Sequence, residues 1–317
     1  MKMKTKLTNI LNNFKGKKIM IIGDIMLDKY IFGKVERISP EAPVQVVEVE
    51  KESYVPGGAA NVANNIASLD GNAYMVGIVG DDQQGNLLIK ELNERRIDTN
   101  GIFIAKDKPT TQKVRVLGQK QQLLRIDYEK KEYINKETED SIINFIKNKK
   151  EIDAIIISDY AKGVITQKLV DEIKTISKNK IIIVDPKPKH LNFYKDVTLI
   201  TPNTKEAIEM TGIEDIESTG KHLLKQLNSP ILITRGEKGM SLFEKEEITN
   251  IPTKAKEVYD VSGAGDTVVA ALTISLTAGA TLKEAATLAN HAAGIKVGKL
   301  GTSTVTIDEI RQSLENE

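Results

Sequence analysis

The chain has 317 residues, a formal net charge of +1 and no cysteine. The near-zero charge gives no reason to expect nucleic acid or a membrane surface as a bulk partner. The missing cysteines exclude disulfides, thiolate metal sites and a cysteine nucleophile, and three histidines are too few for a histidine-rich metal site. The basic N-terminus lacks the apolar run of a signal peptide and no window predicts a membrane span, so we expect a cytoplasmic protein.

Short apolar, β-branched runs alternate with helical patterns along most of the chain. Helical patterns cover residues 81–96 and 166–179. The runs predicted to be buried strands are KIMIIGD (18–24), YMVGIVGD (74–81), AIIISDY (154–160), KIIIVDPK (180–187), VTLITPN (197–203) and ILITRG (231–236). Strands that are apolar on both faces and alternate with helices predict an α/β fold with a parallel sheet covered on both sides. In such a sheet, ligands bind at the carboxyl ends of the strands.

Two stretches interrupt this alternation where a helix would be expected. Residues 30–55 alternate like strands, and residues 112–128 have the pattern of a hairpin around Gly118. We interpret both as a small β lid that stands off the main sheet. No repeat or flexible linker divides the chain, so we expect one domain over residues 1–317, ending in a capped surface helix at 306–317.

The segment DVSGAGD at 260–266 leads into an uncharged apolar helix, which should be buried. The first N–H groups of a helix and its dipole attract anions. Gly263 and Gly265 let the backbone approach an anion closely, because no Cβ intervenes. Asp266, in the first turn, would accept a proton from a substrate hydroxyl. The alternative is that Asp266 caps the helix and the glycines form a tight turn.

Three further glycine or asparagine motifs have both a functional and a structural interpretation. Gly57-Gly58 precedes a helical pattern with Asn61 in its first turn. This segment is either a ligand site or a glycine turn before a packing helix. In TPNTKE, Asn203 and Glu206 are three residues apart, so they would hold Mg²⁺ through water or cap a helix. The segment TRGEKG at 234–239 follows a strand and is either a phosphate-binding turn or a hairpin turn.

Together these motifs resemble the ribokinase-like (PfkB-type) carbohydrate kinases. The motifs are GG-x₂-N, N-x₂-E, T-R-G-x₂-G and D-x₂-G-A-G-D, in the order and spacing of that family. The resemblance covers nearly the whole chain. It implies a three-layer α/β/α ribokinase-like fold, ATP and Mg²⁺ as cofactors, and a β lid that serves as a homodimer contact.

The resemblance also assigns the groups of phosphoryl transfer. Asp266 would be the catalytic base, and Gly263, Ala264 and Gly265 would provide the anion hole together with the N–H of Asp266. Asp260 would belong to the phosphate and cation end, where a monovalent cation is a further candidate.

The nucleotide side is implied in the same way. Asn203 and Glu206 would organise Mg²⁺ through water, and the adenine would rest against the region after the buried helix, near Asn290 and Gly294. The residues assigned to the nucleotide are Asn203, Thr234, Gly236, Gly239, Asn290 and Gly294.

A narrower likeness concerns residues 23–71, which begin GDIMLDKY, and the stretches ISDYAKGV, VDPK and AAGIKVGKLGTSTV. These are similar to the kinases of bacterial ADP-heptose synthesis, which phosphorylate D-glycero-D-manno-heptose 7-phosphate at the anomeric hydroxyl. Such kinases are often fused to a C-terminal nucleotidyltransferase. We expect no nucleotidyltransferase domain within residues 1–317.

A sugar phosphate needs carboxylates or amides for its hydroxyls and cations for its phosphate. Asp24 and Asp28 at the end of the first strand are the predicted hydroxyl acceptors, although either would also cap a turn. Gly57, Gly58 and Asn61 are placed with the same substrate. The phosphate candidates are Arg37, Arg115, Arg125, Lys162 and Lys187, each with a solvated surface position as the alternative. Lys187 is also a candidate for the ATP phosphates.

Other classes of protein fit less well. No G-x₄-G-K-[ST] occurs, which argues against a Walker-type NTPase, and no G-x-G-x-x-G follows the first strand. Three alternatives stay open: another sugar kinase of the same fold, a non-catalytic sugar-phosphate sensor, and a structural subunit that presents the lid.

Overall fold

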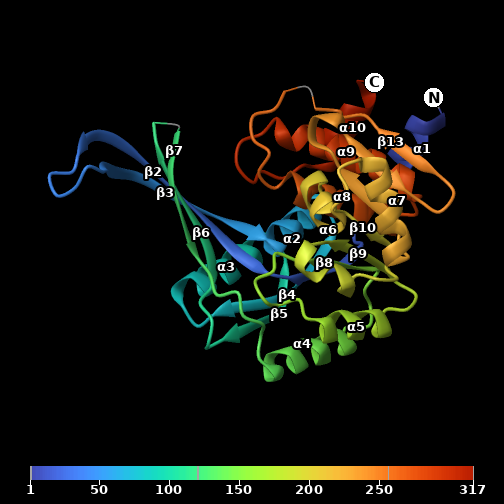
Figure 1. The fold of residues 1–317 in the computed structure, drawn as a ribbon, viewed down its shortest axis with the longest axis horizontal. Coiled ribbons are helices and arrows are strands. Elements are labelled where there is room, and N and C mark those ends of the chain that lie inside the picture. The colour runs from blue at the N-terminus through green and yellow to red at the C-terminus, as the bar shows by residue number, and fades with distance from the viewer. Residues whose placement is uncertain (1, 120, 256, 317) are drawn as a thin grey trace.

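A main sheet with helices on both faces carries a smaller sheet that projects from it (Figure 1). The computed structural model describes residues 2–119, 121–255 and 257–316. The helices are α1 (Lys2–Asn12), α2 (Ala59–Ser68), α3 (Gln83–Glu94), α4 (Lys136–Asn148), α5 (Gln167–Ile176), α6 (Thr204–Thr211), α7 (Ile216–Leu227), α8 (Ala264–Thr277), α9 (Leu282–Val297) and α10 (Ile307–Glu315), with 3₁₀ turns η1 (Pro188–Phe193) and η2 (Gly236–Lys238). The strands are β1 (Lys18–Gly23), β2 (Ile25–Ile38), β3 (Gln45–Gly58), β4 (Asn72–Gly80), β5 (Asp98–Ala105), β6 (Thr111–Gly118), β7 (Gln121–Tyr128), β8 (Ala154–Ser158), β9 (Ile181–Asp185), β10 (Leu199–Ile200), β11 (Ile231–Thr234), β12 (Met240–Phe243) and β13 (Ile248–Ile251).

The main sheet has the order β13-β12-β11-β10-β9-β8-β1-β4-β5. Every pairing from β11 to β5 is parallel, and β12 and β13 add an antiparallel edge. The predicted, mostly parallel sheet is thereby confirmed. The run at 197–203 contributes only Leu199–Ile200, because the chain leaves the sheet and enters α6 at Thr204.

Both faces of the main sheet are buried. Along β1, Ile19 and Ile21 belong to the core beneath α1, α2, α8, α9 and α10, whereas Met20 and Ile22 belong to the core beneath α4, α5, α6 and α7. Successive side chains of a strand point to opposite faces, so an apolar run without alternation requires cover on both sides. This separation establishes the three-layer α/β/α arrangement.

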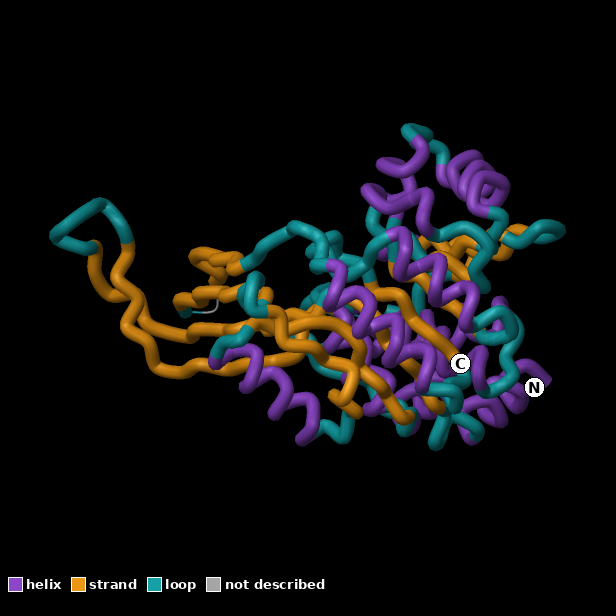
Figure 2. The backbone as a smooth tube through the Cα atoms, turned by 90° about the horizontal axis from the view of Figure 1, so that it is seen from below, coloured by secondary structure: helices purple, strands orange, loops and turns teal. Residues whose placement is uncertain are grey.

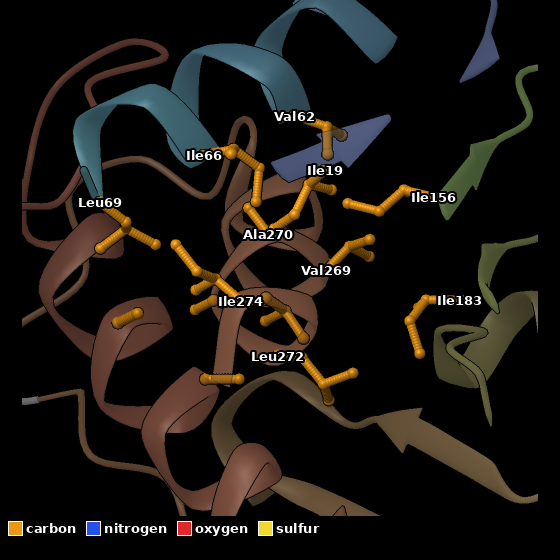
Figure 3. Close-up of a cluster of buried hydrophobic side chains, with 14 of the residues drawn as sticks. Ile19, Val62, Ile66, Leu69, Ile156, Ile183, Val269, Ala270, Leu272 and Ile274 are labelled. Carbon is orange, nitrogen blue, oxygen red and sulfur yellow. The ribbon is translucent and has the colours of Figure 1, made fainter. Parts of the chain in front are cut away.

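Helix α8 is the centre of one of these layers. Its residues from Asp266 to Ser275 are buried, as its uncharged sequence predicts. Figure 3 shows α8 side chains such as Ile274 against Ile66 of α2, with Ile19 of β1 and Ile156 of β8 completing the cluster. Truncating one of these isoleucines to alanine costs about 2–5 kcal/mol in well-packed cores. The first turn of α8 is therefore fixed relative to the carboxyl ends of the strands.

The remaining helices have one apolar face and defined starts. Helix α10 begins at a capping box between Thr306 and Glu309, as predicted for the last segment, and buries Ile310 and Leu314. No helix in the described ranges is long and apolar enough to cross a membrane.

The smaller sheet has the order β3-β2-β6-β7 and forms the lid. Strand β2 pairs antiparallel with β3 and parallel with β6, and β6 pairs antiparallel with β7. Figure 2 shows the β2–β3 hairpin extending far beyond the main body. The lid strands reach closer to the main sheet than predicted, since β2 begins at Ile25 and β3 ends at Gly58. Asp28 therefore lies on a lid strand, which corrects its predicted place at the end of β1.

Candidate active site

Asp266 lies in the first turn of α8, and both of its carboxylate oxygens accept hydrogen bonds. The Tyr160 hydroxyl donates to Oδ1 at 2.6 Å, and Asn61 Nδ2 donates to Oδ2 at 2.6 Å. Asp266 is 7% exposed. Burial raises its pKa, although the two hydrogen bonds oppose that effect. The carboxylate is thus held in one orientation with a proton affinity above that of an ordinary aspartate.

Glycine suits positions 263 and 265 for different structural reasons. Gly263 is the N-cap of α8 with φ 75°, and a Cβ there would lie 2.7 Å from Asn61 Nδ2. At Gly265 a Cβ would meet no described atom within 4 Å. The missing side chain at Gly265 therefore leaves open space directly at the N-terminal N–H groups of α8, which suits an anion. Asp266 does not cap the helix, because its oxygens receive side-chain donors from outside α8.

Tyr160 is a site residue that the sequence analysis missed. It follows β8 on a loop whose next residue, Ala161, has φ 54°, in the left-handed region. Two ammonium groups lie over the Tyr160 ring, with Lys113 Nζ 5.7 Å and Lys187 Nζ 5.5 Å from its centroid. Burial and the charge of Asp266 raise the pKa of its hydroxyl well above the usual value. Tyr160 is therefore a neutral donor to Asp266. The only available signal was its position after a strand end.

Asp24 was predicted to accept sugar hydroxyls, and this role stays a prediction. Its carboxylate accepts backbone N–H groups of Tyr160 at 2.9 Å, Lys162 at 3.0 Å and Val164 at 3.1 Å. The side chain is buried, and burial together with the charge of Asp159 raises its pKa against the effect of these donors. Through these hydrogen bonds Asp24 holds the loop that presents Tyr160.

Asp28 and the lid cations form a second polar group beside Tyr160. Arg115 Nη1 donates to Asp28 Oδ1 at 2.6 Å. In the register of the lid, Asp28 is opposite Lys113 on β6, and Arg115 is opposite Arg125 on β7. Residues two apart on a strand share a face, so these four side chains lie on one face of the lid sheet. Lys113 was also missed by the sequence analysis.

The other predicted phosphate ligands are less available. Arg125 is the outermost, with its side chain 52% exposed and paired with Asp127 at 2.8 Å. The Lys162 ammonium pairs with Glu129. Arg37 lies near the far end of β2, at an exposed position. The structure thus brings Lys113, Arg115 and Arg125 together and leaves Arg37 apart.

Asp24 and Asp28 leave no room for a side chain at Gly57 or Gly58. A Cβ on Gly57 would lie 2.5 Å from Asp28 Oδ2. Gly58 has φ 55°, and a Cβ there would lie 2.6 Å from the carbonyl oxygen of Asp24. Both glycines permit the close approach of β3 to β2 at the base of the lid, next to Asn61.

A small cavity of about 190 Å³ separates Asp266 from the start of α6. Its lining residues are Tyr160, Asp185, Lys187, Thr201, Asn203, Glu206, Thr234, Gly263, Gly265, Asp266, Val268 and Val269. Burial and the charge of Asp266 raise the pKa of Asp185 well above its usual value. Lys187 pairs with Glu206, and their mutual attraction outweighs burial and raises the pKa of the lysine. The cavity is therefore rich in carboxylates close to the anion-attracting end of α8.

Asn203 and Glu206 form the capping box that was weighed as the structural alternative. Asn203 Oδ1 accepts the N–H of Glu206 at 2.9 Å, and Glu206 Oε2 accepts the N–H of Asn203 at 3.0 Å. Among residues 2–119, 121–255 and 257–316, no group of three or more carboxylate or histidine side chains could hold a metal ion directly. The carboxylates that line the cavity suit Mg²⁺ that keeps its water shell, so the predicted metal role stays a prediction.

A larger cavity of about 460 Å³ adjoins the small one and shares Thr234, Gly265 and Val268 with it. The predicted nucleotide residues that line it are Thr234, Gly236, Gly239, Asn290 and Gly294. The TRGEKG segment forms η2 between antiparallel β11 and β12, so the hairpin alternative describes its backbone correctly.

Two residues of this cavity also shape its wall. Asn290 Nδ2 donates to the carbonyl of Pro252 at 2.6 Å. A Cβ on Gly294 would lie 2.8 Å from the backbone of Lys254. Asn290 and Gly294 thus fix the loop after β13 against α9.

Asp260, which was predicted at the phosphate and cation end, lies three residues before the N-cap of α8. It lines a cavity of about 900 Å³ between the lid and residues 300–304, together with Tyr30 and Leu117 of the lid. Its carboxylate accepts the N–H of Ser262 at 2.8 Å and of Gly301 at 2.9 Å. The side chain thereby ties the segment before α8 to the loop after α9.

The fold and the site define a ribokinase-like sugar kinase architecture. Among solved structures, phosphofructokinase-2 from Escherichia coli in complex with potassium superimposes with a TM-score of 0.78 at 20% identity, covering 95% of this chain and 99% of that chain. Ribokinase from Arabidopsis thaliana complexed with ribose and ATP gives a TM-score of 0.73 at 21% identity, covering 95% and 98%.

The family model described as "pfkB family carbohydrate kinase" matches residues 16–309. The chain belongs to this family and is an ATP-dependent carbohydrate kinase. A relative called bifunctional protein HldE from Desulfatibacillum aliphaticivorans is 44% identical over 314 residues, covering 96% of this chain and 64% of the relative. The protein of the same name from Helicobacter pylori strain J99 is 45% identical over 303 residues, covering 93% and 65%. The chain thus spans about two thirds of the length of these relatives.

Proposed function

We propose that this kinase phosphorylates D-glycero-D-manno-heptose 7-phosphate at the anomeric hydroxyl and forms the 1,7-bisphosphate, a step of ADP-heptose synthesis. The carrying observation is the group of cations on the lid face beside Tyr160, because it suits a sugar that already bears a phosphate. The likeness of residues 23–71 to the heptose kinases and the relatives named bifunctional protein HldE support the choice of sugar.

The cations of the lid face lie close enough to repel one another. Burial lowers the pKa of Lys113, and the charges of Lys162, Arg115 and Arg125 act in the same direction. Asp28 opposes these effects but is already paired with Arg115. A phosphate dianion would relieve the repulsion and accept charge-assisted hydrogen bonds from these side chains. We therefore place the 7-phosphate at Lys113, Arg115 and Arg125.

The opposite end of the sugar then faces Asp266. A carboxylate oxygen of Asp266 takes the proton of the anomeric hydroxyl, whose oxygen forms a bond to the γ-phosphorus of ATP while the bond to the ADP oxygen breaks. Asn61 and Tyr160 keep the carboxylate oriented during this transfer. The raised pKa of Asp266 makes it a better proton acceptor than a solvated aspartate.

The nucleotide occupies the larger cavity in this proposal, with its phosphates toward Gly265. The N–H groups of Ala264, Gly265 and Asp266 stabilise the negative charge on the transferring group. Asn203, Glu206 and Asp185 hold the water shell of Mg²⁺, which supplies positive charge to the phosphate oxygens when bound. Lys187 lines the small cavity together with Asp266, and we assign it to the ATP phosphates.

The substrate assignment is tested by measuring ADP release with ATP and Mg²⁺ over a sugar panel. The panel contains D-glycero-D-manno-heptose 7-phosphate, the same heptose without its phosphate, fructose 6-phosphate, fructose 1-phosphate and ribose. We expect efficient turnover with the heptose phosphate alone and weak turnover of the unphosphorylated heptose. Turnover with fructose 6-phosphate instead would keep the phosphate site but discard the heptose. Preferred turnover of ribose or of the unphosphorylated heptose would contradict the role of the lid cations.

We also propose that the lid forms a homodimer contact. Strands β3 and β7 are the edges of the lid sheet. Apolar side chains exposed on the lid are Phe32, Ile38, Val49, Leu124, Ile126 and Tyr128. Exposed edges and apolar side chains of this kind favour pairing with a second copy. Light scattering coupled to size exclusion should give twice the mass of the chain, and Leu124→Lys should shift it toward the monomer.

A further inference from the structure

A fully buried ammonium lies at the end of α9, outside the groups used above. Lys296 is the penultimate residue of this helix and is 0% exposed. Among the described residues, its one hydrogen-bond acceptor is the carbonyl oxygen of Asp260, at 3.4 Å from Nζ. Lysine is almost never fully buried unless it is paired. The position of this charge therefore requires an explanation.

The surroundings of Lys296 are negative. Asp260 contributes its carbonyl and its carboxylate, and the carboxylate is fixed by the N–H groups of Ser262 and Gly301. The N–H groups of Tyr259 and Asp260 donate to Val297 at 2.7 and 3.1 Å, so this segment crosses the C-terminus of α9. The C-terminus of a helix carries partial negative charge. Burial lowers the pKa of Lys296, the charges of Asp260 and Asp266 oppose this effect, and the charge of Lys299 adds to it.

A resident potassium or sodium ion does not fit beside Asp260 in this chain. The resemblance stated above places a monovalent cation there, and one structural neighbour was solved in complex with potassium. Here a positive charge is already buried at Asp260. A second cation would be repelled across a poorly solvated space. Each oxygen of the Asp260 carboxylate also faces a backbone N–H donor.

We propose that the Lys296 ammonium is the built-in cation of the segment between Asp260 and α8, so that this kinase needs no monovalent metal ion. Asp260 lies three residues before Gly263, the N-cap of α8. A fixed positive charge at Asp260 therefore holds the turn that presents the anion-binding N–H groups. The inference does not depend on which sugar the kinase phosphorylates.

The test compares potassium chloride with choline chloride at equal ionic strength. We measure the thermal midpoint of the full chain without sugar and the affinity for ATP with Mg²⁺ by calorimetry. For the unsubstituted protein both quantities should be equal in the two salts. A higher midpoint or tighter ATP binding in potassium would overturn the proposal, whatever the substrate panel shows.

Substituting Lys296 should make ATP binding depend on potassium, a dependence that we expect the unsubstituted chain to lack. Lys296→Ala removes the charge and opens space for an ion, so ATP affinity in choline should fall by about tenfold and recover in potassium. A loss of ATP affinity that potassium does not restore would contradict the proposal that the Lys296 ammonium takes the place of a metal ion. The matched control is Lys299→Ala, because Lys299 pairs with Glu309 and Thr304 at a half-buried position. Its effect should be the same in both salts.

Discussion

The Tyr160 hydroxyl donates to Oδ1 of Asp266 at 2.6 Å, across the gap between the loop after β8 and the first turn of α8. The two residues are 106 positions apart, and each is fixed independently. Tyr160 stands on a loop held by the carboxylate of Asp24, whereas Asp266 stands on a buried helix. Asp266 therefore does not reorient freely, and its proton affinity depends on Tyr160.

The first prediction concerns Tyr160→Phe. The hydrogen bond from Tyr160 lowers the pKa of Asp266 against the effect of burial, so its removal should raise that pKa further. Because the base must be ionised, the acidic limb of the kcat/KM profile should move to higher pH. Tyr133→Phe is the matched control, since the Tyr133 hydroxyl contacts His190 and not Asp266. An acidic limb that stays in place would remove Tyr160 from the control of the base.

Asp266→Asn tests the base itself. The amide keeps the size of the side chain but cannot take the proton of the sugar hydroxyl. We expect kcat to fall by roughly 10²–10⁴-fold, the contribution typical of a general base. ATP affinity, measured by calorimetry, should change little, because the nucleotide cavity does not depend on this proton transfer. Normal turnover by this variant would show that another group is the base.

Gly265→Ala and Gly263→Ala separate ligand space from protein packing. A Cβ at Gly265 meets no described atom within 4 Å, so the variant should keep its thermal midpoint while ATP affinity falls by about tenfold or more. At Gly263 the Cβ would be 2.7 Å from Asn61 and φ is 75°, so that variant should lose about 1–3 kcal/mol of stability. Equal effects of the two substitutions on stability would contradict the open space at Gly265.

The fold could largely be predicted from the sequence, because the hydrophobic pattern that determines it is local and recurs in strand after strand. Strands β1 and β8 are apolar over four consecutive positions, 19–22 and 154–157, which only a sheet covered on both faces can satisfy. Helix α8 could be predicted from an uncharged run preceded by glycines. The short strand β10 could not be delimited, because Pro202 and the capping Asn203 end it although the run 197–203 looks uniform.

The residues of the candidate site could be predicted from the sequence only where they belong to a recognisable motif. Asp266, Gly265 and Thr234 meet around one pair of adjoining cavities, as their motifs suggested. Tyr160 and Lys113 carry no motif, and their importance follows from pairing of segments far apart in the chain. The three backbone contacts of Asp24 with residues 160–164 could not be predicted for the same reason.

Asp185→Asn should stabilise the protein in a pH-dependent way. Burial and the nearby Asp266 raise the pKa of Asp185, so its ionisation costs folding free energy as the pH rises above about 3.9, the usual pKa of aspartate. The neutral amide avoids this cost. The urea midpoint should therefore gain more at pH 8 than at pH 5.

The control for Asp185 is an aspartate whose pKa is shifted in the opposite direction. Lys168 lowers the pKa of the half-exposed Asp140, so Asp140 contributes stability above the usual aspartate pKa and loses it as the pH falls through the lowered value. Asp140→Asn should accordingly lower the urea midpoint at neutral pH. A gain for Asp185→Asn that is equal at both pH values would exclude a charge-based cause.

Lys113→Met tests the phosphate end of the substrate site. The variant keeps most of the aliphatic stem over Tyr160 but removes the ammonium. A lost charge-assisted contact of about 1.5–3 kcal/mol should raise KM for the heptose 7-phosphate by roughly ten- to a hundredfold. KM for ATP and the weak turnover of the unphosphorylated heptose should be unaffected. Lys34→Met, on the exposed part of β2 and paired with Glu50, is the control and should change none of these values. Parallel increases in KM for both heptoses would mean that Lys113 supports the lid and does not bind the phosphate.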